Sequence, residues 1–289
     1  MTVIPLISVV LPCHNAVGRV SDTLQALSLQ TAAPGSFEVL VIDNNSKDSK
    51  ALKDLVATLN ERTGNFLFFT EPKPGLNEVR QAGAEYASAP FVLYLDDDAV
   101  PLCSYVERMA YAVAQYSPDV IGGSLLPFPM VAIGRQFDHT FAGWWSLRHY
   151  GPRDRWLNPG EYFLGSNIGA RRSILQNHGF DRTKDRKGSA LLGGGELWLG
   201  NSRLRRWYCA SAPVFHKVSE ERMSAEYLTR RMLANLSKDR AVASWSDVAR
   251  AFACAVYSPL KTAFIQIHFR LGLALSVITS KLKARRLPL

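Results

Sequence analysis

Three adjacent carboxylates, Asp96, Asp97 and Asp98 (the acidic triplet), follow directly on the apolar run 91–95. An apolar run of this length, with Pro101 shortly after it, predicts a buried strand that presents the three side chains at its carboxyl end. Carboxylates this close repel one another at neutral pH, and a hard divalent metal that carries phosphates is the natural counter-charge. The alternative is structural, because Asp97 or Asp98 could cap the helix that follows.

Polar clusters also follow two other short apolar runs near the start of the chain. His14 and Asn15 come soon after the first run, and Asp43 opens a polar turn after the second. Since ligands of open α/β sheets bind just beyond the carboxyl ends of strands, these clusters should meet the acidic triplet there. Asp43 could accept hydrogen bonds from a base or a ribose, and the triplet could hold ribose hydroxyls and a metal.

Apolar periodicity places alternating strands and helices through the first 120 residues. Apolar, β-branched runs predict the strands, and apolar positions at helical spacing predict the helices. We expect Asn15 to cap the first helix. The alternation is typical of a parallel, doubly wound α/β sheet with right-handed crossovers. The expected strands are 6–11, 37–42, 66–69, 91–95 and one from 120, and the expected helices are 17–30, 52–59, 77–87 and 104–116.

Two common phosphate-binding motifs are missing from the chain. No G-x-G-x-x-G follows the first expected strand, and no G-x-x-x-x-G-K-[ST] occurs anywhere. Dinucleotide and P-loop sites therefore lose their main support, because their glycine-rich loops bring backbone amides to the phosphates. A nucleotide held by carboxylates and a metal remains.

Two isolated polar residues stand out in the second half of the chain. Glu196 follows three glycines, which let the backbone approach a ligand closely, and it opens an expected helix to about residue 207. His216 ends an apolar stretch at another expected strand end, and imidazole is a common metal ligand. Each has a structural alternative. Glu196 could complement a helix dipole, and a lone histidine is often a core or surface residue.

Residues 125–162 are rich in proline, glycine and tryptophan and show no clean periodicity. We expect an ordered, loop-rich insertion there. Its tryptophans, Trp144, Trp145 and Trp156, suit either a packed core or stacking on sugar rings, and a core is the more common use of their large buried area.

The net charge of +9 and the pI of about 9.5 permit nucleic acid, an anionic membrane surface or a phosphorylated substrate as a partner. Nucleic acid is disfavoured because the expected strand ends carry carboxylates, which repel phosphate unless a metal intervenes. The four cysteines stand far apart with no C-x-x-C pair, so we expect buried thiols in a reducing compartment. Neither a signal peptide nor an apolar segment of membrane-spanning length is present, which favours a cytoplasmic protein.

The C-terminal stretch predicts a helical appendage at 241–289, after a main domain at 1–240. Apolar residues recur at helical spacing through 245–284, interrupted near Pro259, and basic residues flank them. A basic amphipathic helix of this kind can lie in a membrane interface, here on the cytoplasmic face. The alternative is a helix packed on the main domain or on a second copy of the chain.

Seven segments, in order over residues 6–235, resemble the family 2 inverting glycosyltransferases, which have the GT-A fold. The resemblance implies a Rossmann-like α/β fold, with a mostly parallel central sheet flanked by helices. Each segment is weak alone, and the order makes the set specific. The segments are Ser8–Asn15, Val39–Ser46, Gly75–Gly83 (similar to the family's G-x-x-x-A-R-N-x-G helix), Tyr94–Asp98 (its D-x-D region), Gly165–Arg172, Gly194–Glu196 and Val214–His216.

The resemblance implies transfer of a sugar, with inversion, from a nucleotide-sugar, expected to be a UDP-sugar, to a hydroxyl of a saccharide or lipid-linked acceptor. Polysaccharide or glycoconjugate synthesis is the implied setting. Asp96 and Asp97 would contact the ribose and Arg80. Asp98 with His216 would coordinate Mg²⁺ or Mn²⁺ on the diphosphate. The full set implied to bind the nucleotide is Pro12, His14, Asn15, Asp43, Asn45, Arg80, Asp96 and Asp97.

Glu196 is implied as the general base that takes the proton of the acceptor hydroxyl. The family's usual G-E-D segment reads Gly195-Glu196-Leu197 here, so its second carboxylate is missing. Asp181 or Asp185, in the preceding loop, is the alternative base. A nucleotidyltransferase, or a non-catalytic relative that binds sugar nucleotides, stays open as another function. The former would share the metal and the aspartates, but a glycine- and lysine-rich segment near the first strand is absent.

Overall fold

The computed structural model describes residues 4–128, 145–181, 195–223 and 227. The alternative base Asp185 and the expected appendage at 241–289 lie outside these residues, and the division of the chain at 240 stays a prediction. Among the described residues, no helix is both long and apolar enough to cross a membrane.

The chain forms two compact units. The first comprises Met1–Phe128, Ser146–Gly188 and Gly194–Lys217 and contains the sheet. The second comprises Pro129–Trp145, Ser189–Gly193 and Val218–Leu289. Within its described part, α6 spans Glu220–Met223, and Trp145 Nε1 donates a hydrogen bond to the carbonyl of Arg222 at 3.0 Å.

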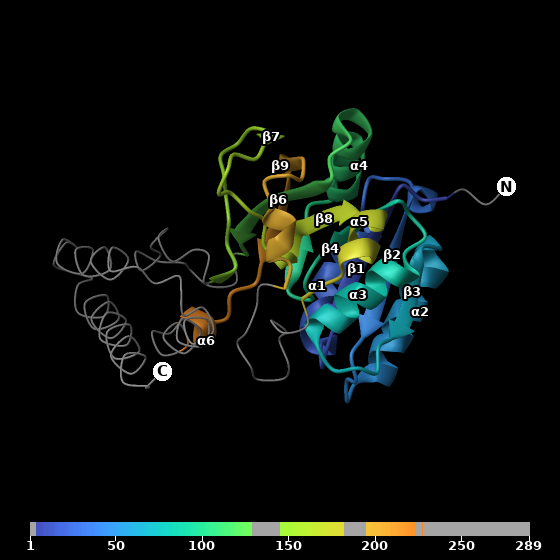
Figure 1. The fold of residues 1–289 in the computed structure, drawn as a ribbon. Helices are drawn as coiled ribbons and strands as arrows, with labels where there is room; N and C mark the ends of the chain where they lie inside the picture. The colour runs from blue at the N-terminus through green and yellow to red at the C-terminus, as the bar shows by residue number, and fades with distance from the viewer. Residues whose placement is uncertain (1–3, 129–144, 182–194, 224–226, 228–289) are drawn as a thin grey trace, which may run out of the picture. The chain divides into compact units, whose positions relative to one another are not determined.

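In the described part of the first unit, a nine-stranded sheet runs in the order β3-β2-β1-β4-β8-β6-β9-β5, with β7 paired to β9 (Figure 1). The strands are β1 (Ile7–Cys13), β2 (Phe37–Asp43), β3 (Phe66–Thr70), β4 (Phe91–Tyr94), β5 (Ala99–Pro101), β6 (Val120–Pro127), β7 (Arg155–Trp156), β8 (Ile168–Arg171) and β9 (Arg206–His216). The helices are α1 (Val17–Ser28), α2 (Ser49–Thr63), α3 (Leu76–Tyr86), α4 (Tyr105–Tyr116) and α5 (Arg172–His178).

The predicted parallel pairing is found in the part of the sheet that the first half of the chain builds. Strands β3, β2, β1 and β4 pair in parallel, with a helix between successive strands of the chain. By contrast, β8 is antiparallel to both of its neighbours, β4 and β6. The sheet is therefore mixed, because β8 comes in from the loop-rich segment rather than from a crossover helix.

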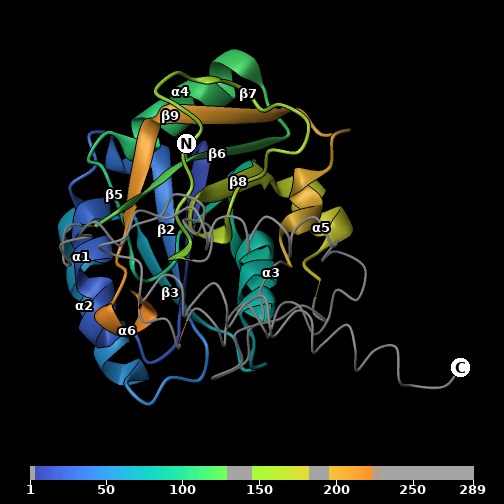
Figure 2. The ribbon, with the colours of Figure 1, turned by 90° about the vertical axis from the view of Figure 1, so that its left-hand side faces the viewer.

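Different helices cover the two faces of the sheet, since successive strand residues point to opposite sides. Val9 and Leu11 share one core cluster with residues of α1, α2 and α4, whereas Val10 and Leu40 share another with residues of α3 and α5. In Figure 2 the strands stand between α1 and α2 on one side and α3 and α5 on the other. All seven residues of β1 are buried, as expected for a strand covered on both faces.

The segment after Glu196 differs from the predicted helix to about residue 207. It forms a short 3₁₀-helix, Leu197–Gly200, and then the eleven-residue strand β9. Aromatic residues such as Trp207 and Tyr208 favour a strand, and both pair with β6. This strand carries His216 to its place in the site described below.

The predicted cap of α1 and the capping alternative for the triplet are both wrong. The N-cap of α1 is Ala16 rather than Asn15, and the amide of Val17 donates to Asp48 Oδ2 of the next loop at 3.0 Å. Neither Asp97 nor Asp98 caps α4, because β5 lies between them and the helix, whose N-cap is Ser104. The triplet therefore does not supply the N-cap of α4.

Three cysteines lie among the described residues, and all three are free thiols. Cys13 and Cys209 are buried, as predicted, but Cys103 is exposed. Cys103 lies in the link between β5 and α4, away from the faces that pack on the core. Burial raises the pKa of Cys209 to about 12, so this thiol stays protonated and unreactive at neutral pH.

An ion pair between Arg155 and Glu161 stabilises the described part of the loop-rich insertion. Both Nη atoms of Arg155 lie 2.7 Å from the carboxylate of Glu161, and this contact lowers the pKa of Glu161 to about 2. Trp145 is buried, in line with the core interpretation. Trp156 is 40% exposed and packs edge-on against Trp207 with ring centroids 4.9 Å apart. Trp144 lies outside the described residues.

Candidate active site

The loops that follow β1, β2 and β3 are tied together by Asn44. Its Nδ2 donates to the carbonyls of Glu71 and Lys73, both at 2.7 Å, and its Oδ1 accepts from the amide of Gly75 at 2.9 Å. Its own amide donates to the carbonyl of Cys13 at 2.8 Å. One buried residue, through its side chain and its main-chain amide, therefore fixes three strand ends relative to one another.

The predicted nucleotide-side residues His14, Asn15 and Asn45 line these loops. His14 Nδ1 lies 2.6 Å from the carbonyl of Asn44, and Asn15 Oδ1 accepts from the amide of Lys47 at 2.8 Å. Asn45 Nδ2 donates to a carbonyl of the β3–α3 loop at 2.6 Å. Asn15 and Asn45 have φ angles of 49° and 56°, a left-handed conformation that asparagine adopts more easily than most residues.

Asp43, at the end of β2, is only 2% exposed. It lies in register with Cys13 of β1, and Pro12 precedes that position. Asp43 Oδ2 accepts a long hydrogen bond from the amide of Ser46 at 3.4 Å, while Oδ1 has no hydrogen-bond partner among the described residues. A buried acceptor without a partner is costly, so a ligand N–H or O–H would be stabilising at this oxygen.

The acidic triplet lies between β4 and β5, opposite the end of β9. Pairing of β5 with β9 places Ala99 across from His216, and His216 Nε2 lies 3.2 Å from Asp98 Oδ1. Asp96 joins this pair, because side-chain ligand atoms of Asp96, Asp98 and His216 all lie within 4.8 Å of one another. The structure thus brings together the two predicted metal ligands, Asp98 and His216, and adds Asp96 as a third donor and second carboxylate.

This donor set fits the predicted Mg²⁺ or Mn²⁺. Carboxylate oxygens suit both ions, and imidazole is acceptable to Mn²⁺ in particular. His216 is 2% exposed, and within the described structure its Nδ1 has no hydrogen-bond partner. Around the cluster, four carboxylates (the triplet and Glu196) and two guanidiniums (Arg19 and Arg80) leave a formal charge of −2, which a divalent cation would cancel.

Arg80 of α3 connects the triplet to Glu196. Its buried guanidinium lies 3.3 Å from Asp96 Oδ1 through Nη2 and 3.3 Å from Glu196 Oε2 through Nη1. Burial alone would lower the pKa of Arg80, but the carboxylates of Glu196 and Asp96 outweigh burial and raise it. Arg80 therefore stays cationic and holds the predicted base beside the predicted metal site. The contact with Asp96 was predicted, and the contact with Glu196 was not.

Asp97 does not contact Arg80, contrary to the prediction. Both of its oxygens accept from Arg19, with Nε 2.8 Å from Oδ1 and Nη2 2.6 Å from Oδ2. The side chains of these two neighbouring residues point in opposite directions. Asp97 faces α1, whereas Asp96 faces α3 on the other side of the sheet. Burial raises the pKa of Asp97 to about 6, opposed by the hydrogen bonds from Arg19 and reinforced by the charge of Asp98.

Gly195, the described member of the predicted glycine run, packs against Asn77 of α3. A Cβ at Gly195 would lie 2.6 Å from Asn77 Cγ, so only glycine lets this backbone come so close. Asn77 Nδ2 donates to the carbonyl of Asp181 at 2.8 Å, and the amide of Asp181 lies 3.4 Å from the carbonyl of Gly195. The close packing brings Glu196 to Arg80 and sets Asp181, the alternative base, in the adjoining segment.

Sequence reasoning missed two residues of the site. Ser166 Oγ donates to Asp96 Oδ2 at 2.5 Å, and Arg19 donates hydrogen bonds to both carboxylate oxygens of Asp97. The contact of Ser166 depends on β8 lying next to β4, which no local pattern indicates. Arg19 is one arginine on the polar side of an amphipathic helix, and a single sequence offers no signal that separates it from other exposed arginines.

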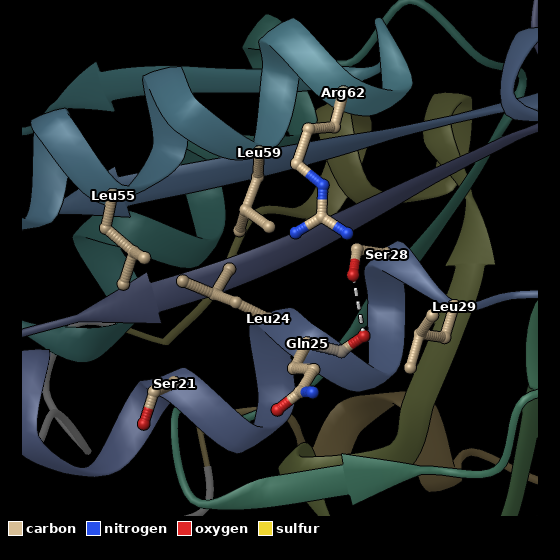
Figure 3. A pocket seen from close by; sticks show the side chains of 8 residues that line it. All are labelled: Ser21, Leu24, Gln25, Ser28, Leu29, Leu55, Leu59 and Arg62. Atoms are coloured by element: carbon tan, nitrogen blue, oxygen red, sulfur yellow. Dashed lines mark hydrogen bonds between the residues drawn. The ribbon is translucent and has the colours of Figure 1, made fainter.

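A separate pocket of about 240 Å³ lies between α1 and α2, away from these residues (Figure 3). Its apolar side chains come from both helices, and Ser28 Oγ donates to the carbonyl of Gln25 at 2.8 Å within α1. None of the site residues lines it, so it is not part of the candidate active site. The lining residues are Ser21, Leu24, Gln25, Ser28, Leu29, Leu55, Leu59 and Arg62.

The family model described as "Glycosyl transferase family 2" matches residues 8–179. The match covers more than half of the chain and includes Asp43, Arg80 and the acidic triplet. The chain belongs to glycosyl transferase family 2.

A curated relative is the validoxylamine A glucosyltransferase of Streptomyces hygroscopicus subsp. limoneus, 34% identical over 116 residues, which are 40% of this chain and 25% of that protein. The matched part spans 40% or less of the length of the first curated relatives.

Solved structures show that this member of family 2 has the GT-A fold. The mannosyltransferase PcManGT of Pyrobaculum calidifontis, in complex with GDP-Man and Mn²⁺, has a TM-score of 0.56 and 15% identity, over 99% of this chain and 76% of that one. S. aureus TarS 1-349, in complex with UDP-GlcNAc, has a TM-score of 0.54 and 14% identity, over 97% of this chain and 91% of that one. The mixed, mostly parallel sheet with helices on both faces is the shared architecture.

Gly165, in the short 3₁₀-helix before β8, is needed as glycine because it packs against Arg80. A Cβ there would lie 2.7 Å from Arg80 Cζ, so alanine must push the guanidinium away from its two carboxylates. We expect Gly165→Ala to lower stability by about 1–3 kcal/mol and sugar transfer by at least about tenfold, because Arg80 loses its position. Urea unfolding and donor turnover measure the two effects.

The matched control is Gly35→Ala, whose added Cβ would meet nothing within 4 Å. It should change stability by no more than about 0.5 kcal/mol and leave turnover unaltered. If Gly165→Ala behaved like this control, the guanidinium of Arg80 would have room to move without consequence, and its placement would not matter.

Proposed function

We propose that the chain transfers a sugar from a UDP-sugar, with inversion and with a divalent metal, to a hydroxyl of a saccharide or lipid-linked acceptor. The observation that carries this proposal is the convergence of Asp96, Asp98 and His216 beside the Arg80–Glu196 pair. The same strand edge holds the unpaired Oδ1 of Asp43. Transfer from a nucleotide-sugar needs these three parts: a base pocket, a cation for the diphosphate and a general base for the acceptor.

The nucleotide base would lie against Asp43, with the backbone around Pro12 and the side chains of His14, Asn15 and Asn45 around it. Uracil has a single ring N–H, which matches the one carboxylate oxygen of Asp43 that lacks a partner. Guanine presents two adjacent donors on the same edge and would need both oxygens, of which Oδ2 would have to accept a second hydrogen bond beside the long one from the amide of Ser46. This difference favours a UDP-sugar over a GDP-sugar.

Asp98 and His216 would hold Mg²⁺ or Mn²⁺, with Asp96 as a further ligand or as the ribose contact. When bound, the cation neutralises the charge that develops on the leaving diphosphate. Asp96 is fixed for either role, since Arg80 donates to one of its oxygens and Ser166 to the other. A ribose contact of Asp97 stays a prediction.

Glu196 would accept the proton of the attacking hydroxyl. Its carboxylate is 12% exposed and is paired with the buried guanidinium of Arg80 at 3.3 Å, an arrangement that fixes its orientation. Direct attack by the hydroxyl on the anomeric carbon, from the face opposite the diphosphate, inverts the configuration and needs one base on the protein. Leu197, which stands where the family has its second carboxylate, is 46% exposed, so Glu196 is the carboxylate of this segment that pairs with Arg80.

A screen of nucleotide-sugars tests this proposal. With Mn²⁺ present, we expect release of UDP from at least one UDP-sugar and loss of that release on addition of EDTA. The anomeric configuration of the product, measured by NMR, should be opposite to that of the donor. Release of pyrophosphate would instead support a nucleotidyltransferase. Tight binding of a nucleotide-sugar without any release would support a non-catalytic relative.

For the C-terminal appendage, which lies outside the described residues, we propose attachment to an anionic membrane surface on its cytoplasmic face. The support is the alternation of apolar and basic residues through 245–284. The full-length chain should sediment with anionic liposomes, and a truncation at about Ser244 should stay in the supernatant. Equal sedimentation of the two would contradict membrane attachment and favour packing on protein.

A further inference from the structure

Arg19, in the first turn of α1, contacts two loops of the site at once. Its Nε and Nη2 donate to the two oxygens of Asp97 at 2.8 and 2.6 Å. Its Nη2 and Nη1 also donate to the carbonyls of His14 and Asn15, both at 2.9 Å. A bidentate guanidinium fixes direction as well as distance, so one side chain sets the loop after β1 relative to the middle of the acidic triplet.

The main chain of the same helical turn is joined to the metal side of the site. Lys217, which directly follows His216, donates from Nζ to the carbonyl of Arg19 at 3.0 Å and pairs with Asp22 at 2.5 Å. The amide of Lys217 donates to the carbonyl of Asp98 at 2.9 Å. Arg19 therefore stands where the nucleotide-side loop, the triplet and the end of β9 meet.

The contact with Arg19 also determines which carboxylates face the candidate metal site formed by Asp96, Asp98 and His216. The side chain of Asp97 is only 12% exposed and lies between two other aspartates in the chain. A third carboxylate free to rotate would compete for a cation or repel its neighbours. With both oxygens held by Arg19, Asp97 faces α1, and Asp96 and Asp98 are left to converge with His216.

We propose that Arg19 is a positioning residue for the nucleotide-sugar, and that it acts through Asp97. By holding Asp97 together with the carbonyls of His14 and Asn15, it sets the distance between the base pocket and the cation site. This inference rests on the proposed function, since both ends of the donor must be bound for that distance to matter. It also requires Arg19 and Asp97 to work as one unit, because removal of either breaks the same contact.

A double-mutant cycle tests the unit. The variants are Arg19→Met, Asp97→Ala and the double variant, and the readouts are KM for the UDP-sugar, kcat, and the Kd of UDP with Mn²⁺ by calorimetry. We expect each single change to raise KM and Kd about tenfold with kcat within about twofold, and the double variant to match the singles instead of reaching about a hundredfold. Arg19→Lys should also show raised KM and Kd, because an ammonium cannot form the bidentate contact with the two oxygens of Asp97.

Arg62→Met is the matched control, since Arg62 is an exposed arginine of α2 outside the site. It should keep wild-type KM and Kd. Thermal unfolding identifies any variant that fails to fold, and if Arg19→Met fails, Arg19→Lys carries the test because it keeps the charge.

Losses that multiply in the double variant would show that Arg19 and Asp97 act separately and would overturn the inference. Wild-type KM and Kd in folded Arg19→Met or Arg19→Lys would do the same. These outcomes differ from a failure of the proposed function, in which the wild-type chain itself neither binds UDP with Mn²⁺ nor releases UDP from any donor.

Discussion

Asp98→Asn is expected to lower metal-dependent UDP release by about 10³-fold, because a metal ion contributes several kcal/mol to a transition state in which charge builds on the leaving diphosphate. Asparagine keeps the shape of the side chain and can still form a hydrogen bond to His216, whose Nε2 lies 3.2 Å from Asp98 Oδ1. It removes the negative charge that a divalent cation needs. The loss should therefore come from the metal rather than from the fold.

The measurement is the rate of UDP release as a function of Mn²⁺ concentration. Asp98→Asn should need far more Mn²⁺ than the wild type, with a thermal midpoint close to it. Asp54→Asn is the control, since Asp54 pairs with Lys50 on the exposed side of α2 and should change neither quantity. A folded Asp98→Asn variant with the wild-type rate and the wild-type Mn²⁺ dependence would contradict the assignment of the metal site.

Glu196→Gln is expected to lower transfer by about 10²–10⁴-fold, the usual contribution of a general base. Glutamine is nearly isosteric, and Arg80 keeps its second contact, with Asp96 Oδ1 at 3.3 Å. Affinity for UDP with Mn²⁺ should therefore stay within about twofold of the wild type, since the base is needed only for the acceptor. Loss of turnover with retained nucleotide binding separates a catalytic role from a structural one.

Asp181→Asn is the natural comparison, because Asp181 is the alternative base and lies in the segment whose backbone packs beside Gly195. We expect it to retain most of its activity. If Asp181→Asn lost transfer and Glu196→Gln kept it, the base would be Asp181, and the Arg80–Glu196 pair would be a structural ion pair only.

Local pattern predicted the first half of the fold well. Strands β1 to β4 and helices α1 to α4 follow from apolar runs and helical spacing, which reflect burial of one face or of both. The position of β8 could not be predicted, because its place between β4 and β6 depends on pairing between distant segments. The prediction that Asn15 caps α1 was wrong for the same reason. Asp48, from another loop, accepts the hydrogen bond from the amide of Val17 that Asn15 was expected to accept.

The meeting of Asp98 with His216 could be predicted because strand ends of an α/β sheet meet at one edge, but Asp96 was expected at the ribose rather than in the same cluster. The partners of Asp97 and Glu196 could not be predicted. Which carboxylate meets Arg80 depends on side-chain direction at a turn, and adjacent aspartates carry no signal of that direction. Membership of the family is shown by the match over residues 8–179, while the sugar, the acceptor and the linkage depend on side chains of the pocket that no motif describes.

Crystals of the chain soaked with Mn²⁺ and UDP test the central claim most directly. Anomalous scattering from manganese should give a peak bound by Asp98 and His216, with Asp96 within reach of it and the uracil ring N–H on Asp43 Oδ1. A manganese peak away from Asp98 and His216, or uracil bound away from Asp43, would contradict the account.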